Sequence, residues 1–154
     1  MRALITGVGG FVGGHLVRHL LERGDAAITG AVYLPPENHP DLVATGIELH
    51  HVDLTDGEAV ERLLRQTRPD HIYHLAAQSF VPESFDDPWS TLENNIRSQL
   101  NIILSLIRLG LSARLLVVGT SEVYGPVAED EIPIDEEQPL RPPSPYSVST
   151  VAQD

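Results

Sequence analysis

The chain has 154 residues, enough to bury the core of one domain. Its apolar share of 42% is typical of a soluble globular protein, and no run approaches the roughly 18 to 20 apolar residues of a membrane helix. A net charge of −12 without a basic patch argues against nucleic acid as a partner, and the lack of cysteine excludes disulfides and thiolate sites. No secretory signal pattern is present, so we expect a cytoplasmic protein that does not enter a membrane.

The first fourteen residues predict a strand, a glycine turn and a helix. Ala3–Ile5 is a short apolar run typical of a buried strand. Gly7, Gly10 and Gly13 follow at three-residue spacing and lead into a helix expected over about Phe11–Arg23. Such a turn directs free N–H groups and the positive end of the helix dipole at an anion, and its glycines allow a pyrophosphate to approach closely. The position of the turn favours a dinucleotide site; a sharp turn without a ligand is the alternative.

The second predicted strand, Ala26–Tyr33, ends without the usual sign of the cofactor's identity. In a dinucleotide-binding fold, an Asp or Glu there holds the ribose 2′-hydroxyl of NAD, whereas an Arg favours NADP. Here Glu37 lies beyond two prolines. The residues therefore leave NAD and NADP open. The prolines between residues 35 and 40 predict a loop without regular structure.

The rest of the chain alternates between strand and helix. We expect strands over Ile47–Val52, His71–Leu75 and Leu115–Val118, and helices over Glu58–Thr67, Trp89–Leu109 and from Tyr146 onward. Loops are expected around Pro82 and Pro88, and through the proline- and acid-rich stretch that ends at Pro145. The alternation predicts an α/β fold: a Rossmann-type doubly wound parallel sheet with helices on both faces, forming one domain over residues 1–154.

Small and polar residues follow the predicted strands. Ligands of such folds bind beyond the carboxyl ends of the strands, so we expect four segments to meet along one edge. These are Gly7–Val12, Asp53–Leu54, Ala76–Ser79 and Thr120–Glu122. Their convergence favours a ligand site there more than any single motif does.

Three residues are candidates for catalysis: Thr120, Glu122 and Tyr146. Thr120 and Glu122 lie just past the end of a central strand, where reactive groups belong in this architecture. A buried Glu122 can act as a general acid or base; the alternative is a loop carboxylate or a helix cap. Tyr146 can exchange a proton with a carbonyl or alcohol if a positive charge lies beside it; the alternative is a Tyr that closes the edge of the core.

The seven histidines do not predict a metal site. His50 and His51 point to opposite faces of a strand, and His71 and His74 also differ in face. Without cysteine, this pattern does not support zinc. We therefore expect no metal.

Together the motifs resemble the extended short-chain dehydrogenase/reductase family, which contains the nucleotide-sugar epimerases and dehydratases. The matching segments occur in the family's order and spacing: Thr6–Gly13, Asp53–Asp56, His74–Ser79, Asn95 with Asn101, Thr120–Gly125 and Pro142–Tyr146. Within the family, Ala77–Val81 and Thr120–Glu122 look most like GDP-mannose 4,6-dehydratase and the related GDP-4-keto-6-deoxy-mannose reductase.

The resemblance implies a bound NAD or NADP with its pyrophosphate on Gly7–Val12 and its adenine near Asp53 and Leu54. The implied cofactor-binding residues are Gly7, Gly10, Phe11, Val12, Gly13, Asp53, Leu54, Leu75, Ala76, Ala77, Asn95 and Tyr146. It also implies a nucleotide-sugar substrate, a GDP-hexose, in contact with Ser79, Thr120 and Ser121.

The resemblance further implies lyase or oxidoreductase chemistry. In a dehydratase, Tyr146 would take the C4 hydroxyl proton as hydride leaves for the nicotinamide, and Glu122 would remove the C5 proton before water leaves from C6. Thr120 would hydrogen-bond the C4 oxygen. In a reductase, Thr120 and Tyr146 would protonate the oxygen of a keto-sugar.

The chain departs from the family pattern at two points. The family motif is Tyr, three residues and then Lys, and here Thr150 stands at the Lys position. That Lys normally holds the nicotinamide ribose and supplies the positive charge beside the Tyr, so the alternative to an enzyme is a catalytically silent NAD(P)-binding module or a truncated product. The family also continues with a smaller domain that binds the nucleotide sugar, and we expect that domain to be absent. The resemblance implies a homodimer formed through the helix over residues 89–109.

Overall fold

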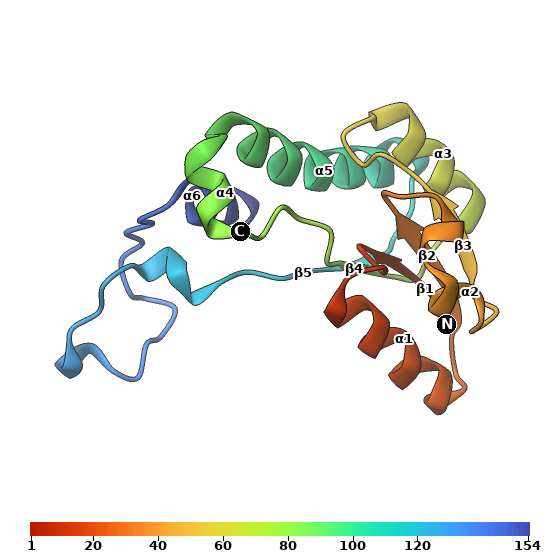
Figure 1. Cartoon of the computed structure of the whole chain (residues 1–154), viewed down its shortest axis with the longest axis horizontal. Helices are drawn as coiled ribbons and strands as arrows, with labels where there is room; N and C mark the ends of the chain where they lie inside the picture. The colour runs from red at the N-terminus through yellow and green to blue at the C-terminus, as the bar shows by residue number, and fades with distance from the viewer. The chain divides into compact units, whose positions relative to one another are not determined.

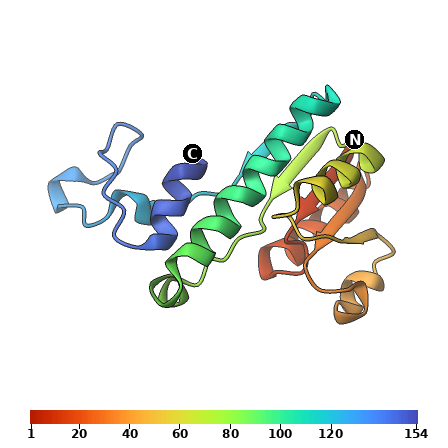
Figure 2. The ribbon, with the colours of Figure 1, turned by 90° about the horizontal axis from the view of Figure 1, so that it is seen from above.

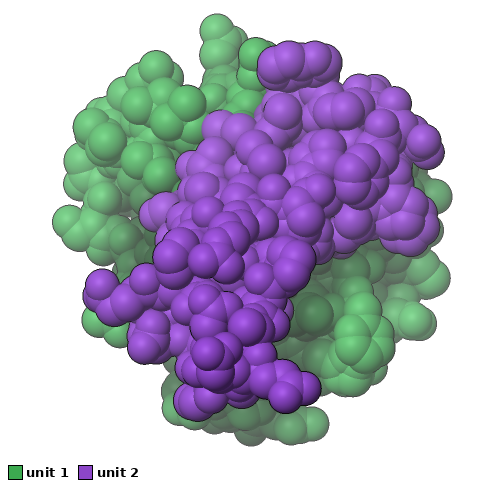
Figure 3. Space-filling view, turned by 90° about the vertical axis from the view of Figure 1, so that its left-hand side faces the viewer, with its two compact units in different colours: residues 1–77, 97–118 green, residues 78–96, 119–154 purple.

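The computed structural model describes all residues from 1 to 154. The chain divides into two compact units, which Figure 3 colours separately. The first unit contains residues 1–77 and 97–118, and the second contains residues 78–96 and 119–154. The expectation of a single domain over residues 1–154 stays a prediction.

A five-stranded parallel sheet forms the centre of the first unit, with the strand order β3-β2-β1-β4-β5. The strands are β1 (Arg2–Thr6), β2 (Ala27–Val32), β3 (Glu48–His51), β4 (His71–His74) and β5 (Arg114–Val117). Each overlaps a strand that the sequence predicts. The last residue of the central strand β1, Thr6, is paired with Ala31 of β2 and with His74 of β4. The predicted parallel α/β fold is therefore confirmed.

Helices cover both faces of this sheet (Figure 1). One face is covered by α1 (Phe11–Arg23) and the short α2 (Pro40–Val43), and the other by α3 (Gly57–Thr67) and the later part of α5 (Pro88–Leu109). Figure 2 shows α5 as one unbroken helix, of which residues 97–109 belong to the first unit.

The side chains of β1 alternate between two hydrophobic clusters. Ala3 and Ile5 pack in the same cluster as Val17 of α1, whereas Leu4 packs in the cluster that contains Leu64 of α3. This is the period-two alternation of a strand. Because β1 is buried on both faces, its sequence is a continuous apolar run instead of an alternating one.

The helix ends follow the signals in the sequence. Gly24, at a φ of 68°, ends α1 in the left-handed conformation, and Gly110, at a φ of 60°, follows α5 in the same way. Asp56 caps α3, because its carboxylate accepts the N–H groups of Glu58 and Ala59. The predicted C-terminal ends of α1 and α5 are confirmed, whereas α3 begins at Gly57, one residue before the predicted start. Pro88, expected in a loop, is the first residue of α5.

Two proline-containing segments are more regular than the sequence predicts. The expected loop after β2 contains a 3-10 turn, η1 (Pro36–Asn38), and the helix α2, and the expected loop around Pro82 contains α4 (Val81–Asp86). In each helix or turn, proline occupies one of the first two positions. The N–H group that proline lacks has no partner inside a helix at those positions, so proline begins these helices without losing a bond. The prediction of irregular structure there is wrong.

The second unit is built from short elements. They are α4, residues 88–96 of α5, the 3-10 turns η2 (Ser121–Tyr124) and η3 (Glu129–Glu131), and α6 (Pro145–Gln153). α6 packs against α4 and η2. The helix expected from Tyr146 thus begins one residue earlier, at Pro145. In neither unit is any helix both long enough and apolar enough to cross a membrane.

His74, the last residue of β4, is buried against Thr6. Its Nδ1 lies 2.7 Å from Thr6 Oγ1, and its Nε2 has no hydrogen-bond partner. Burial lowers the pKa of the His74 imidazole to about 4. His74 is therefore neutral in the folded chain at neutral pH.

We expect His74 to make the folded chain less stable as the pH falls. The imidazole of the unfolded chain takes up a proton near its ordinary pKa of about 6.5, whereas the folded one does so only near pH 4. Acidification between these values therefore favours unfolding, and the loss due to His74 is about 2 kcal/mol between pH 7 and pH 5. Urea unfolding of the wild type and of His74→Asn at both pH values measures it.

The exposed His51 supplies the control for this experiment. His51→Asn should keep the pH dependence of the wild type, and His74→Asn should flatten it. An equal pH dependence in all three proteins would contradict the account.

Candidate functional site

The turn between β1 and α1 is packed so closely that two of its glycines have no room for a side chain. Gly7 has a φ of 66°, and a Cβ there would lie 2.7 Å from the backbone nitrogen of Ala76. A Cβ on Gly13 would lie 2.6 Å from the Cα and the carbonyl oxygen of Val8. The turn is therefore pressed against the end of β4 on one side and against the start of α1 on the other.

The N-terminus of α1 carries N–H groups that have no partner within the chain. Gly10 precedes the helix without a side-chain cap, and the first turn contains no acidic residue. The N–H groups of Phe11, Val12 and Gly13 make no hydrogen bond within the chain. Phe11 and Val12 are 83% and 59% exposed. Together with the helix dipole, these N–H groups form a seat for an anion.

Hydrogen bonds of Thr6 hold the end of β4 beside this turn. Thr6 Oγ1 accepts the N–H of Ala76 at 3.3 Å and also contacts the ring of His74. The N–H of Leu75 donates to the carbonyl oxygen of Thr6. Leu75 and Ala76, both predicted to flank the cofactor, are thereby fixed next to Gly7.

Asp53 and Leu54 follow β3 at the carboxyl edge of the same sheet. Asp53 is exposed, and its Oδ1 accepts both the N–H and the hydroxyl of Thr55. Asn101 Nδ2 donates to the carbonyl oxygens of Leu54 and Thr55 at 2.9 and 3.0 Å. Asn101, to which the sequence pattern gave no role, is therefore the residue of α5 that holds this segment in place.

The loop after β2 folds back over the glycine turn. A Cβ on Gly9 would overlap the ring of His39, which shows that His39 covers this glycine. Parallel strands place their carboxyl ends at one edge, so the first unit brings together Gly7–Gly13, Asp53–Leu54 and Leu75–Ala77. Free N–H groups beside closely packed small residues fit the pyrophosphate of a dinucleotide.

The three candidate catalytic residues all lie in the second unit. Thr120 precedes η2, and its Oγ1 accepts the N–H of Glu122 at 3.2 Å. The carboxylate of Glu122 accepts the hydroxyl of Ser144 at 2.5 Å. Tyr146 lies in the first turn of α6 and is half-buried. Ser144 is a contact of the candidate site that sequence reasoning missed, although its position before a helix indicated a cap.

Thr150, at the position of the family's Lys, is buried, and its hydroxyl is used within α6. It donates to the carbonyl oxygen of Tyr146 at 3.0 Å.

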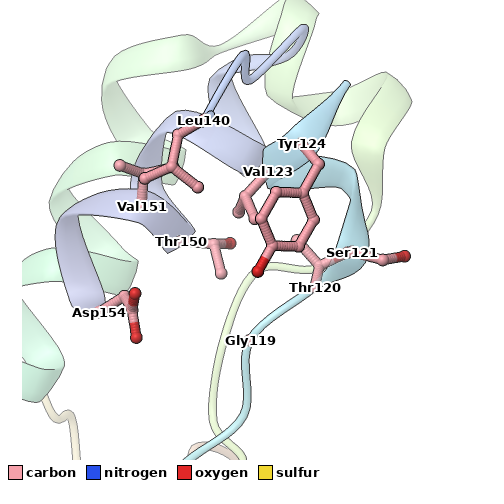
Figure 4. A pocket seen from close by; sticks show the side chains of 9 residues that line it. All are labelled: Gly119, Thr120, Ser121, Val123, Tyr124, Leu140, Thr150, Val151 and Asp154. Carbon is pink, nitrogen blue, oxygen red and sulfur yellow. The ribbon is translucent and has the colours of Figure 1, made fainter. Parts of the chain in front are cut away.

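Thr150 also lines a pocket of about 360 Å³ (Figure 4). The lining residues are Gly119, Thr120, Ser121, Val123, Tyr124, Leu140, Thr150, Val151 and Asp154. Thr120 and Ser121 are thus brought together there, whereas Glu122 and Tyr146 do not line it. No lining residue carries a positive charge.

Asn95, predicted to contact the cofactor, is fully buried in the second unit and joins two segments to α5. Its side chain accepts the N–H of Gln78 and donates to the carbonyl oxygen of the same residue. It also donates to the hydroxyl of Ser149 on α6 at 2.9 Å. Both polar atoms of the Asn95 side chain are therefore engaged within the chain, and its contact with a cofactor stays a prediction. Ser79, the predicted substrate contact, is exposed.

His15 and His19 are four residues apart on α1, a spacing that zinc sites use. Among residues 1–154, no group of three or more His, Cys, Asp or Glu side chains is arranged to hold a metal ion. The expectation that the chain holds no metal stays a prediction.

Over residues 4–154 the chain matches the model of a protein family described as GDP-mannose 4,6 dehydratase. The chain belongs to this family. Its relative from Pseudomonas aeruginosa, a GDP-6-deoxy-D-mannose reductase, is 37% identical over 151 residues, which cover 98% of this chain and 44% of the reductase. The resemblance stated from the motifs is thus confirmed.

Solved structures of similar proteins support the same fold. The UDP-glucose 4-epimerase of Thermus thermophilus, in complex with NAD, has a TM-score of 0.86 and 38% identity, with 99% of this chain and 48% of that chain covered. RMD from Pseudomonas aeruginosa, complexed with NADPH, has a TM-score of 0.79 and 35% identity, with coverages of 99% and 46%. This family member therefore spans less than half the length of the relatives it matches.

Replacing each of two neighbouring glycines of α1 with alanine should change the stability of the fold in opposite directions. Gly13→Ala places a Cβ against the backbone of Val8 and should destabilise the fold by about 1–3 kcal/mol. A Cβ on Gly14 meets nothing within 4 Å. Gly14→Ala should therefore stabilise the helix by about 0.5–1 kcal/mol. Urea unfolding of both variants measures the difference, and a shift of the same sign and size in both would refute the close packing of the turn.

Proposed function

We propose that this chain is the NAD(P)-binding part of a nucleotide-sugar dehydratase or reductase that acts on a GDP-hexose. The glycine turn carries the proposal, because it presents the unpartnered N–H groups of Phe11, Val12 and Gly13 at a turn too closely packed for side chains at Gly7 and Gly13. The family and the reductase relative support the class of substrate. Relatives solved with NAD and with NADPH support the class of cofactor and leave the choice between them open.

The residues of the first unit would hold the cofactor. Its pyrophosphate would accept hydrogen bonds from the N–H groups of residues 11–13. The exposed Asp53 and its neighbour Leu54 would lie beside the adenine, and Leu75–Ala77 would flank the remainder. When bound, NAD(P) would accept hydride from the sugar or deliver it.

The residues of the second unit would move the protons. Tyr146 would hold or take the proton of the sugar's C4 oxygen, and Thr120 would hydrogen-bond that oxygen. In a dehydratase, Glu122 would remove the proton from C5. A reductase has no such step, so Glu122 would matter less there. Ser79 and Ser121, both exposed, would contact the sugar.

A catalytically silent NAD(P)-binding module is the second candidate, and Thr150 favours it. The Thr150 hydroxyl is bonded within α6, and none of the residues that line its pocket is cationic. Without a positive charge beside it, a phenol is a poor proton acceptor at neutral pH. In this alternative the cofactor binds but the sugar does not react.

Cofactor binding should respond to charge at the start of α1. Val12→Asp places a carboxylate among the free N–H groups, so NADH and NADPH should bind at least about tenfold more weakly. The same carboxylate should leave the fold as stable or stabilise it by about 0.3–1 kcal/mol. Calorimetric titration together with urea unfolding measures both effects. Val12→Asn is the uncharged control and should bind more tightly than Val12→Asp; equal affinities in the two variants would count against the anion seat.

Turnover separates the two candidates. The wild-type protein is incubated with GDP-mannose and either NAD or NADP, and a 4-keto product is sought by NMR. Formation of the product supports the dehydratase, and its loss in Glu122→Gln assigns the base. A second assay follows the reductase reaction in reverse. Cofactor binding without product in both assays supports the silent module. Absence of both binding and turnover would reject both candidates.

We infer that the protein forms a homodimer through α5. Leu100, Leu104 and Ile107 share one stripe of the helix and are 48%, 36% and 70% exposed. Ile107→Glu places a charge in this stripe and should convert a dimer into a monomer in analytical ultracentrifugation. Val43→Glu, at a site that is 51% exposed on α2, is the matched control and should remain dimeric. A wild type that sediments as a monomer at all concentrations would contradict the inference.

A further inference from the structure

Ser144 caps α6 with an oxygen that also contacts Glu122. Ser144 is only 3% exposed and precedes Pro145, the first residue of the helix. Its Oγ accepts the N–H of Ser147 at 3.0 Å. This is the N-cap bond, and it uses the Ser144 oxygen as an acceptor.

The hydroxyl group of Ser144 can still donate one hydrogen bond. Two oxygens lie within reach: Glu122 Oε1 at 2.5 Å and Ser147 Oγ at 3.0 Å. The Ser147 hydroxyl in turn lies 2.9 Å from the carbonyl oxygen of Ser144, to which it can donate. A distance of 2.5 Å is typical of an O–H group that donates to a carboxylate, a bond about twice as strong as one between neutral groups. The proton of Ser144 therefore belongs to the bond with Glu122.

The second oxygen of Glu122 has no such partner. Oε1 accepts from Ser144, whereas no hydrogen bond within the chain is found for Oε2. The contact thus holds one oxygen of the carboxylate and leaves the other to take up a proton. The cap also fixes the first turn of α6, which contains Tyr146. The side chain of Ser144 therefore holds Glu122 by a hydrogen bond and fixes the helical turn that contains Tyr146. These are two of the three candidate catalytic residues.

We propose that Ser144 is a positioning residue for Glu122, in addition to its role as the cap of α6. It fixes the carboxylate by donating to Oε1, so that Oε2 is the atom that exchanges a proton. The catalytic part of this inference rests on the proposed function, whereas the contact itself does not. Two variants separate the cap from the donor: glycine is nearly as good an N-cap as serine but has no hydroxyl, and threonine keeps both functions.

An isotope effect in NMR spectra tests the contact without turnover. The full chain is labelled with ¹³C at the glutamate carboxyl carbons, and spectra are compared in H₂O and D₂O. The Glu122 signal is assigned by its loss in Glu122→Gln. We expect an isotope shift at Glu122 beyond that of the exposed glutamates, retained in Ser144→Thr and lost in Ser144→Gly. Absence of this extra shift in the wild type, or its persistence in Ser144→Gly, would overturn the proposal.

Kinetics test whether Ser144 positions Glu122 for catalysis. If the wild-type chain dehydrates GDP-mannose, Ser144→Gly should lower kcat on the order of tenfold or more with KM little changed, and Ser144→Thr should have the kcat of the wild type. An unchanged kcat in a folded Ser144→Gly protein would overturn the positioning role. If the wild type shows the isotope shift but no turnover in either the dehydratase or the reductase assay, the contact stands and the proposed function fails.

Discussion

The structure depends on the absence of a side chain at Gly7. The backbone of the first turn approaches the backbone of Ala76 so closely that a Cβ would overlap it. This approach brings the end of β4 beside the start of α1 and lets Thr6 bond to both His74 and Ala76. A larger residue would push these segments apart. The unpartnered N–H groups of α1 are consequences of the same turn, because Gly10 gives the helix no cap.

The two units carry different parts of the proposed chemistry. The first unit contains the anion seat and the segments that would lie along a cofactor. The second contains Thr120, Glu122 and Tyr146. Thr120 accepts the N–H of Glu122, and Glu122 accepts the hydroxyl of Ser144. Asn95 donates to Ser149, whose hydroxyl donates to the carbonyl oxygen of Tyr146. Thr150 sits in the same unit with its hydroxyl turned into α6. The proposed seat for the pyrophosphate is therefore formed by residues of the first unit, whereas Thr150, at the position of the family's Lys, lies in the second.

Much of the fold could be predicted because its signals are local. A continuous apolar run predicts β1, glycine spacing predicts the turn, and Gly24 and Gly110 mark helix ends through their left-handed conformation. The short helices α2 and α4 were missed because their prolines indicated irregular structure. Proline stops a helix that is already formed but is tolerated where one begins, and composition alone does not distinguish the two positions.

The candidate site was predicted less completely, because several of its contacts join residues far apart in the chain. Asn101 reaches across 46 and 47 positions to hold Thr55 and Leu54, and Ser144 reaches Glu122 across 22. The buried pair of Thr6 and His74 is separated by 68 positions. No periodicity or local motif encodes such pairs. The sequence indicates candidate residues by their type and position. Their hydrogen-bond partners follow only from the packing of the helices and strands that carry them.

We infer that the start of α1 is the seat of a dinucleotide pyrophosphate. Titration of the ¹⁵N-labelled chain with NAD and with NADP, followed by backbone amide NMR, tests it most directly. We expect saturable shifts that are largest at the amides of Phe11, Val12 and Gly13, with further shifts at Asp53 and Leu54. Saturable shifts confined to other segments, or no shifts with either nucleotide at millimolar concentration, would contradict it.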